Sequence, residues 1–207
     1  MKIPMKRRIN TVNNTLLAFA TPIQQLHFEN TEALNAEVAR RVLAMREQVP
    51  SQQYSNLGGW HSDSNFLQNL GEPYGSQLAW MFMRAVYAAV DAIVEMTDAP
   101  SIQPVIECWA NVNQRGDSNM PHIHAGSPWS GVYYVATEPN ARGEIYFIDP
   151  RLASQMCLHP LNPFGATSPI TIVPVAGMML VFPSFLQHGV HPYQGDSPRI
   201  SIAFNLM

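Results

Sequence analysis

Cysteine, charge and long apolar runs are all scarce in this chain of 207 residues. Cys108 and Cys157 are its two cysteines, which excludes a disulfide-rich scaffold and a zinc site made of cysteines. Charged residues make up 13% of the chain and hydrophobic residues 46%, which is a globular rather than a disordered composition. No apolar run approaches the roughly 18 to 20 residues of a membrane helix, so we expect no membrane association.

The start of the chain and its net charge bear on the location of the protein and on its partners. Asparagines interrupt the basic N-terminal segment where a signal peptide would have its apolar core, so we expect a cytoplasmic protein. The net charge of −3 and the absence of a basic groove argue against nucleic acid as a partner. A small molecule or a peptide is the expected substrate, and a homodimer is compatible with the sequence.

The pattern of the chain changes near residue 100. We expect a single domain over 1–207, with an N-terminal elaboration over 1–100 and a core over 101–207. Apolar residues at helical spacing predict two amphipathic helices in the elaboration, at 31–48 and 73–97. The stretch between these helices contains Gly58 and Gly59 and is expected to form a loop or a short strand.

Eight short β-rich runs follow, separated by Gly, Pro, Asn and Asp. They lie at 102–113, 119–125, 129–137, 143–149, 169–174, 177–182, 186–192 and 199–205. Eight such strands after two amphipathic helices predict an α+β, mainly β fold. This fold is a double-stranded β-helix, a cupin-like jelly roll of two sheets, with the helices packed on one sheet. An open β-sandwich is the alternative.

Three histidines form a candidate metal site. His122 and His124 are two positions apart, so on a strand both side chains point to the same face. His188 lies 66 positions after His122 (188 − 122), on the seventh expected strand. Two imidazoles on one face and a third from a distant strand can bind a divalent metal from three directions.

The last expected strand carries a candidate binding site for a carboxylate. Arg199 and Ser201 share a face of this strand, eleven residues after His188 (199 − 188). A guanidinium beside a hydroxyl group suits a carboxylate, and an inward Arg next to a metal would be costly without an anionic partner. This cost favours a dicarboxylate cosubstrate. Asn111 and Asn113 share a face of the first core strand and are candidates for contacting cosubstrate or substrate.

This arrangement resembles the double-stranded β-helix oxygenases that use Fe(II) and 2-oxoglutarate. Those enzymes carry an H-x-D pair on the second core strand, a distal His on the seventh and an Arg on the eighth. The end of this chain is similar to the prolyl-hydroxylase-type pattern H-x-V-x-P…G…R-x-S and reads FPSFLQHGVHPYQGDSPRISIAFN. The resemblance implies that Arg199 binds the distal carboxylate of 2-oxoglutarate.

More narrowly, several segments resemble a bacterial and phage group of 2-oxoglutarate oxygenases, and this likeness runs from about residue 19 to residue 205. These segments are SNLGGWHS, HIHAGSPWSGVYYV, EIYFIDPR and FPSFLQHGVHP. The second aromatic hydroxyl of SGVYYV contacts 2-oxoglutarate in such enzymes, and Tyr134 occupies its position here. The resemblance implies an oxidoreductase that uses Fe(II), 2-oxoglutarate and O2, with ascorbate as a reductant that keeps the iron ferrous. Hydroxylation of the substrate, with 2-oxoglutarate converted to succinate, is the expected reaction.

The sequence departs from the family at the second metal ligand, where His124 replaces the usual carboxylate. Two interpretations remain open. In the first, His122, His124 and His188 bind the metal together. In the second, His124 is the first ligand and Gly126 takes the place of the carboxylate, so the metal has two histidine ligands.

Two further predictions concern residues outside this set. His61, beside the two glycines, is expected in a loop with water as its partner, and the alternative is that it lines the entrance of the site. The segment 151–169 is long for a loop and is a candidate lid.

Two rival functions share the fold and the histidines. A non-redox, metal-binding cupin-type binding module would have no use for Arg199 and Ser201 behind the metal. A metalloenzyme of cupin type that needs no cosubstrate would release no succinate. The substrate itself is not identified by the sequence.

Overall fold

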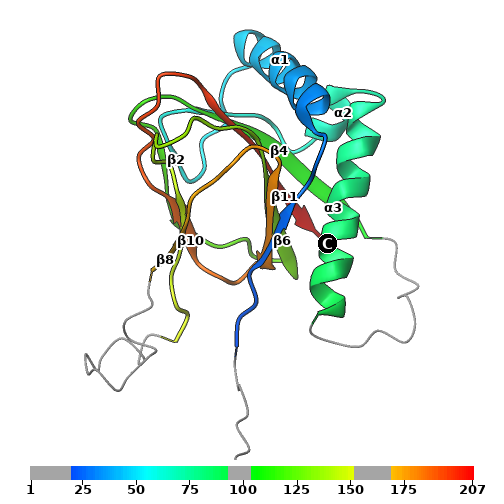
Figure 1. The fold of residues 1–207 in the computed structure, drawn as a ribbon, viewed down its shortest axis with the longest axis vertical. Helices are drawn as coiled ribbons and strands as arrows, with labels where there is room; N and C mark the ends of the chain where they lie inside the picture. The colour runs from blue at the N-terminus through cyan, green and yellow to red at the C-terminus, as the bar shows by residue number, and fades with distance from the viewer. Residues whose placement is uncertain (1–19, 93–103, 152–168) are drawn as a thin grey trace, which may run out of the picture.

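The computed structural model of the protein describes residues 20–92, 104–151 and 169–207. Two antiparallel sheets face each other, and helices cover one of them on its outer side (Figure 1). The described helices are α1 (Glu32–Gln48), α2 (Phe66–Leu70) and α3 (Tyr74–Asp91). None of them combines the length and the apolar character that crossing a membrane requires.

Eleven strands are described. They are β1 (Gln24–His27), β2 (Asn56–Leu57), β3 (Trp60–His61), β4 (Ile106–Asn113), β5 (Ser118–His122), β6 (Trp129–Ala136), β7 (Ile145–Phe147), β8 (Ile170–Ile172), β9 (Met178–Pro183), β10 (His188–Val190) and β11 (Arg199–Leu206). The six-stranded sheet has the order β1-β9-β6-β11-β4-β3, and the five-stranded sheet has the order β2-β5-β10-β7-β8. The core strands from β4 to β11 alternate between the two sheets, except that β7 and β8 are consecutive and pair within the five-stranded sheet. This is the arrangement of a double-stranded β-helix.

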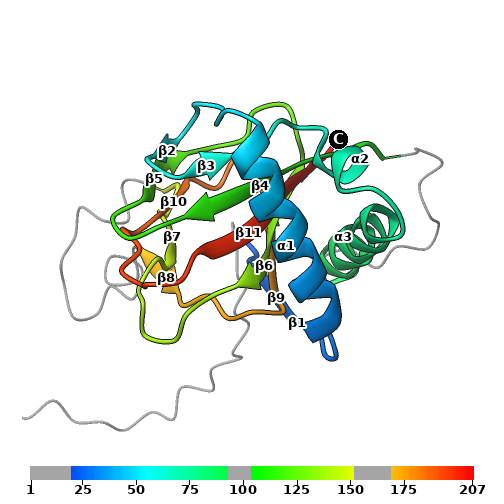
Figure 2. The same ribbon diagram turned by 90° about the horizontal axis from the view of Figure 1, so that it is seen from above.

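The outer face of the six-stranded sheet packs against the helices (Figure 2). Side chains alternate along each strand, so one set faces the helices and the other faces the second sheet. On β11 the outward set includes Phe204, whose ring stacks on Phe82 of α3 with 4.2 Å between centroids. Gly131 of the neighbouring strand leaves room for this ring, because a Cβ at that position would overlap it. This packing fixes β11, and with it the side chains on the inner face.

The inner face of the same sheet is partly polar. It carries Arg199, Ser201 and Asn205 on β11, while Asn113 lies opposite Arg199 on β4. An apolar cluster between the sheets closes one side of this space and includes Leu180, Phe182, Ile145 and Phe147. Polar and charged side chains inside a protein need partners or a ligand, so this inner face is the natural place to look for function.

The predicted fold class is confirmed, and each of the eight expected strands has a described counterpart. The structure adds detail in the stretch between the two long helices, which forms two short strands and α2. Strands that precede residue 100 join both sheets, so the N-terminal part does more than cover one face. The interpretation of 1–207 as one domain stays a prediction. The candidate lid at 151–169 lies outside the described residues except for its first and last residue. Cys157 also lies outside them.

Candidate active site

His122, His124 and His188 come together between the two sheets. The centroids of their rings are 4.4 to 5.2 Å apart. One nitrogen from each ring can be chosen so that all three atoms lie within 4.8 Å of one another. His124 lies two residues beyond the end of β5, and its backbone N–H donates to the Ser184 carbonyl. The predicted grouping is therefore present, although one histidine is held by the following loop rather than by the strand.

Two of the three imidazoles are oriented by the backbone. Nδ1 of His122 lies 2.7 Å from the Met120 carbonyl oxygen, and Nδ1 of His188 lies 2.9 Å from that of Leu186. A carbonyl can only accept, so Nδ1 carries the proton in both rings and Nε2 keeps a free lone pair. Such bonds are typical of histidines that bind a metal through the other nitrogen.

Burial keeps these imidazoles neutral. It lowers the pKa of His188 to about 3 and that of His124 to about 4, and it also lowers the pKa of His122. The neighbouring imidazoles lower the pKa values of His188 and His124 further. Only a neutral imidazole offers a lone pair to a metal, so all three rings are in the form that binds metal at neutral pH.

The geometry gives little support to the alternative in which two histidines bind the metal and Gly126 takes the place of the carboxylate. Gly126 is exposed, has a φ of +91° and lies in a turn outside the cavity lining. His122 instead is the direct strand partner of His188. A register shift between His188 and Val190 accompanies this pairing, and such bulges are known to redirect side chains next to active sites.

Arg199 is buried on the inner face and is only partly satisfied there. Its relative exposure is 2%, and Nη1 donates to Asn113 Oδ1 at 2.9 Å and to Ser201 Oγ at 3.5 Å. Nε has no hydrogen-bond partner among the described residues. Burial lowers the pKa of this guanidinium from its ordinary value, yet an Arg side chain stays charged in proteins. A buried cation with a free N–H calls for an anion.

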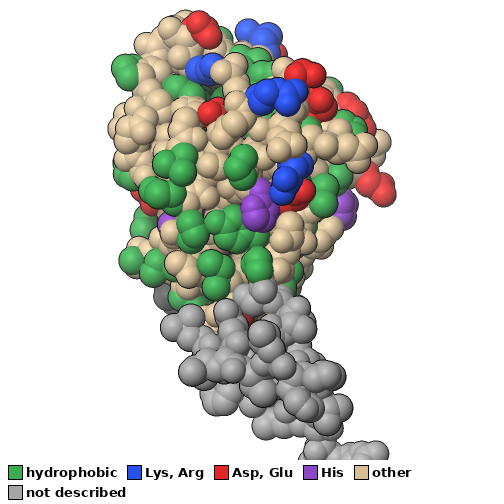
Figure 3. Space-filling model, turned by 90° about the vertical axis from the view of Figure 1, so that its left-hand side faces the viewer, with side chains coloured by type: hydrophobic (Ala, Val, Ile, Leu, Met, Phe, Trp, Pro, Cys, Tyr) green, Lys and Arg blue, Asp and Glu red, His purple; other side chains and the backbone are tan. Residues whose placement is uncertain are grey.

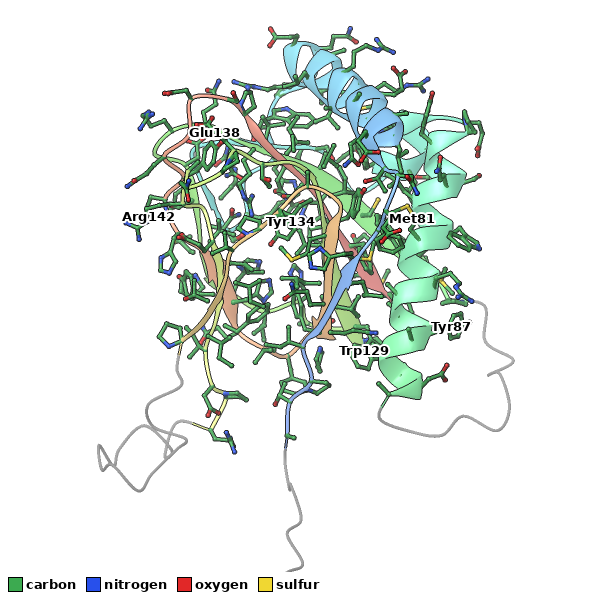
Figure 4. All side chains as sticks on the ribbon, viewed as in Figure 1. Met81, Tyr87, Trp129, Tyr134, Glu138 and Arg142 are labelled. Atoms are coloured by element: carbon green, nitrogen blue, oxygen red, sulfur yellow. The ribbon has the colours of Figure 1, made fainter. Side chains whose placement is uncertain are left out.

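Tyr134 lies beside this cation. It is the strand partner of Ser201, because the register between β11 and β6 shifts after Ile200. The Tyr134 hydroxyl is buried and also lacks a described hydrogen-bond partner, and burial raises its pKa to about 12 against the opposing effect of Arg199. The phenol therefore keeps its proton and can donate it to an acceptor. Figure 4 shows Tyr134 between the sheets, whereas Glu138 and Arg142 lie at the periphery.

One cavity of about 540 Å³ joins the three histidines to Arg199, Ser201 and Tyr134. Two orphaned donors at one end and three neutral imidazoles between the sheets match the two ends of a metal-chelating dicarboxylate. The residues present thus fit Fe(II) together with 2-oxoglutarate. The structure brings all six predicted metal- and cosubstrate-binding residues to this cavity, and the candidate Asn111 also lines it. Asn113 does not line it and instead accepts a hydrogen bond from Arg199.

Sequence reasoning misjudged one residue of the wall, His61, and missed another, Trp109. The solvated loop predicted for His61 was wrong, and the alternative that it lines the site agrees with the structure. His61 lies on β3, is 7% exposed and packs on Trp109 with 5.6 Å between ring centroids. The centroid of the Trp109 ring in turn lies 5.4 Å from the centroid of the His124 ring. Trp109 shares the inner face with Asn111 and Asn113 at a spacing of two, so the alternation on the first core strand could have revealed it.

The rim of the cavity is apolar. Tyr54, Met120 and Ile123 line it and are 69%, 45% and 52% exposed. On the side of the molecule that carries the five-stranded sheet, hydrophobic side chains gather in the middle and lower part, and most charged side chains lie above them (Figure 3). Such a rim suits the carbon skeleton of an organic substrate.

A jelly roll that holds three histidines and a buried Arg in one cavity defines the class: a metal-dependent protein of double-stranded β-helix fold. Residues 107–205, almost the whole core from β4 to β11, match the family described as "Putative 2OG-Fe(II) oxygenase". The chain belongs to the Fe(II)/2-oxoglutarate-dependent oxygenase superfamily and is a dioxygenase that uses both cofactors.

Solved structures with low sequence identity share the fold. A prolyl-4-hydroxylase from Pseudomonas putida has a TM-score of 0.58 and 16% identity, with 89% of this chain and 91% of that chain covered. HygX from Streptomyces hygroscopicus, solved with nickel, 2-oxoglutarate and hygromycin B, has a TM-score of 0.55 and 12% identity over 90% and 82% of the chains. A Trichoplax adhaerens prolyl hydroxylase, solved with a peptide fragment, has a TM-score of 0.56 and 12% identity, with 89% of this chain and 83% of that chain covered. No curated protein matches the chain.

Proposed function

We propose that His122, His124 and His188 together bind Fe(II), and that Arg199, Ser201 and Tyr134 bind the distal carboxylate of 2-oxoglutarate. One observation carries this assignment. Arg199 Nε and the Tyr134 hydroxyl are both buried without a described partner, in the cavity that the three histidines also line. Leaving two buried donors unsatisfied costs free energy, and a bound carboxylate removes this cost.

The protein residues position the reactants. Arg199 forms a charge-assisted contact with the carboxylate, and Tyr134 adds a neutral donor from the adjacent strand. When bound, Fe(II) with 2-oxoglutarate and O2 supplies the oxidising chemistry, in which 2-oxoglutarate becomes succinate and CO2 and the substrate is hydroxylated. The apolar wall between the sheets keeps water away from the reacting groups.

Three neutral imidazoles in place of two imidazoles and a carboxylate make the metal site more positive by one unit. With the buried Arg199 nearby, the cavity then presents a strongly positive lining to a doubly charged anion. This charge favours tight binding of 2-oxoglutarate and is a direct consequence of His124.

The remaining parts of the proposal concern partners and location. The substrate is a small molecule or a peptide, in line with the hygromycin B and the peptide that occupy two proteins of the same fold. The absence of a described membrane helix is compatible with the proposed cytoplasmic location.

A thermal melting experiment tests this function. Mn(II), which does not support turnover, is added with and without 2-oxoglutarate, and the Tm of the chain is recorded. A ligand that binds only the folded chain raises its stability, so we expect a further increase in Tm when 2-oxoglutarate joins the metal. Succinate formation with Fe(II), ascorbate and O2 then reports the reaction. Metal stabilisation without any effect of 2-oxoglutarate would instead favour the non-redox binding module.

A further inference from the structure

The end of the cavity away from Arg199 contains a carboxylate that the chemistry described above does not use. Glu107 lies opposite Asn205 in the pairing of β4 with β11, while Arg199 lies opposite Asn113 at the other end of the same pairing. Six residues separate Arg199 from Asn205 (205 − 199), which corresponds to roughly 20 Å along a strand. Both Glu107 and Arg199 line the same cavity.

The charges of this cavity are separated. Among the described residues that line it, Arg199 is the one Lys or Arg and Glu107 the one Asp or Glu. No described Lys, Arg or His forms an ion pair with Glu107. With Arg199 committed to 2-oxoglutarate, Glu107 remains as an anion at the opposite end of the space.

A chain of hydrogen bonds presents this carboxylate as an acceptor. Ser184 and Ser130 are 2.6 Å apart, Ser130 donates to Asn205 Oδ1 at 2.8 Å, and Asn205 Nδ2 donates to Glu107 Oε2 at 3.3 Å. Because the Ser130 hydroxyl proton goes to Asn205, the proton between the two serines comes from Ser184. The donors all run in one direction and end at Glu107, which keeps further acceptor capacity for a ligand.

An aromatic face lies next to Glu107 on the same strand. Trp109 is two residues away, so it shares the inner face, and it also lines the cavity. One face of this indole stacks on His61, and the wall therefore offers a carboxylate beside the indole surface that lines the cavity. This pair of groups attracts ammonium and guanidinium ions, through charge-assisted hydrogen bonds and through cation–π contact.

We propose that the substrate of this enzyme carries a cationic nitrogen, a primary ammonium or a guanidinium group, and that Glu107 selects it. This inference rests on the proposed function, because it takes Arg199 to be occupied by 2-oxoglutarate. The cation binds between Glu107 and Trp109. The substrate thus extends from this end of the cavity towards the histidines.

Calorimetric titration with pairs of probes that differ in charge tests the proposal. The probes are N-acetyl-L-argininamide against N-acetyl-L-citrullinamide, and N-acetyl-L-lysinamide against N-acetyl-L-norleucinamide. A second arm uses short glycine peptides with a central arginine or citrulline, and tighter binding of the arginine peptide than of argininamide identifies a peptide substrate. The chain is loaded with Mn(II) and 2-oxoglutarate, and the probes are also titrated into the metal-free chain.

For the wild type we expect the charged member of at least one pair to bind at least about tenfold more tightly than the neutral one, as for a charge-assisted contact. Glu107→Gln should reduce this ratio to below about twofold. Glu47→Gln, on the exposed side of α1, is the matched control and should keep the full ratio. Raising the salt concentration from about 0.05 to about 0.5 M should weaken the binding of the charged probe to the wild type and leave the binding of the neutral probe unchanged. This test does not depend on the folding of any variant.

Three results would overturn the inference: equal binding within every pair, no measurable binding of any charged probe, or a full ratio in a folded Glu107→Gln variant. The first titration, of 2-oxoglutarate into the Mn(II)-loaded wild type, separates the two proposals. Failure at that step contradicts the proposed function, whereas success there followed by equal binding of the probes contradicts the cationic substrate alone.

Discussion

The centre of the Arg199 guanidinium lies 5.1 Å from the centroid of the Tyr134 ring, and each of these side chains has one buried donor without a described partner. Unsatisfied buried donors are rare in folded proteins because each costs about 1 to 3 kcal/mol. Two of them side by side mark the place where an anionic ligand completes the structure.

The Tyr134→Phe variant should separate ligand binding from stability. Removing the orphaned hydroxyl should leave the ligand-free chain as stable as the wild type or more stable by about 1 kcal/mol. The same change should weaken 2-oxoglutarate binding about tenfold, the usual value of one hydrogen bond to a charged group. Urea unfolding and calorimetry measure the two effects.

Tyr133→Phe provides the matched control for that variant. The Tyr133 hydroxyl points to the other side of the sheet and donates to Asn35 Oδ1 at 2.7 Å. Its loss should reduce stability by about 1 kcal/mol and leave 2-oxoglutarate affinity unchanged. Equal effects of the two variants on affinity would contradict the role assigned to Tyr134.

Replacement of Arg199 should abolish cosubstrate binding while metal binding persists. We expect Arg199→Gln to lower the affinity for 2-oxoglutarate by at least about 100-fold, because a buried charge pair is lost. Mn(II) affinity should change little, since Arg199 is not among the three clustered histidines. Arg142→Gln at the exposed periphery (Figure 4) should bind 2-oxoglutarate like the wild type. A calorimetric Kd within about threefold of wild type for Arg199→Gln would reject the assignment.

The metal site can be tested at the position where two interpretations differ. Loss of a group that only orients a metal ligand reduces metal affinity by about 10- to 100-fold. Loss of a ligand itself should cost more, so we expect His122→Ala to reduce metal affinity by at least about 100-fold if His122 is a ligand. His191→Ala is the control, because His191 packs on Tyr146 and lies outside the histidine cluster. Full metal binding and full turnover in His122→Ala would establish the site with two histidines.

Packing behind the site should govern stability. Phe204→Ala removes the ring that stacks on Phe82 and fills the space above Gly131, so we expect a loss of about 3 to 5 kcal/mol. Phe185→Ala, at a side chain that is 58% exposed, should change stability by less than about 0.5 kcal/mol. The shift of the urea midpoint measures both. Similar midpoints for the two variants would show that this contact does not hold the helices to the sheet.

The stability of the protein should fall at alkaline pH because of Cys108. Burial raises the pKa of this thiol from 9.0 to about 12. Between these values the unfolded chain loses the thiol proton while the folded chain keeps it, so stability decreases as pH rises above 9. Iodoacetamide labelling of a Cys157→Ser variant reports on Cys108 alone and should be slow at pH 9 unless denaturant is added. Rapid labelling of the native variant would contradict this burial.

Much of the fold followed from local patterns. The alternation of apolar residues located all eight core strands, and the pair Arg199 and Ser201 was placed correctly because side chains two apart on a strand share a face. The structure differs from the prediction where contacts between residues distant in sequence determine the position of a side chain. His61 is held by pairing with β4 and by stacking on Trp109, and neither contact leaves a local signal. The register shift that sets Ser201 opposite Tyr134 is equally invisible in the sequence.

The most direct test of the site is a crystal structure of the wild-type chain with Mn(II) and 2-oxoglutarate. We expect nitrogen atoms of His122, His124 and His188 on the metal, and the distal carboxylate of 2-oxoglutarate in contact with Arg199 Nε and the Tyr134 hydroxyl. A metal without His122 among its ligands, or a carboxylate bound away from Arg199, would contradict the account.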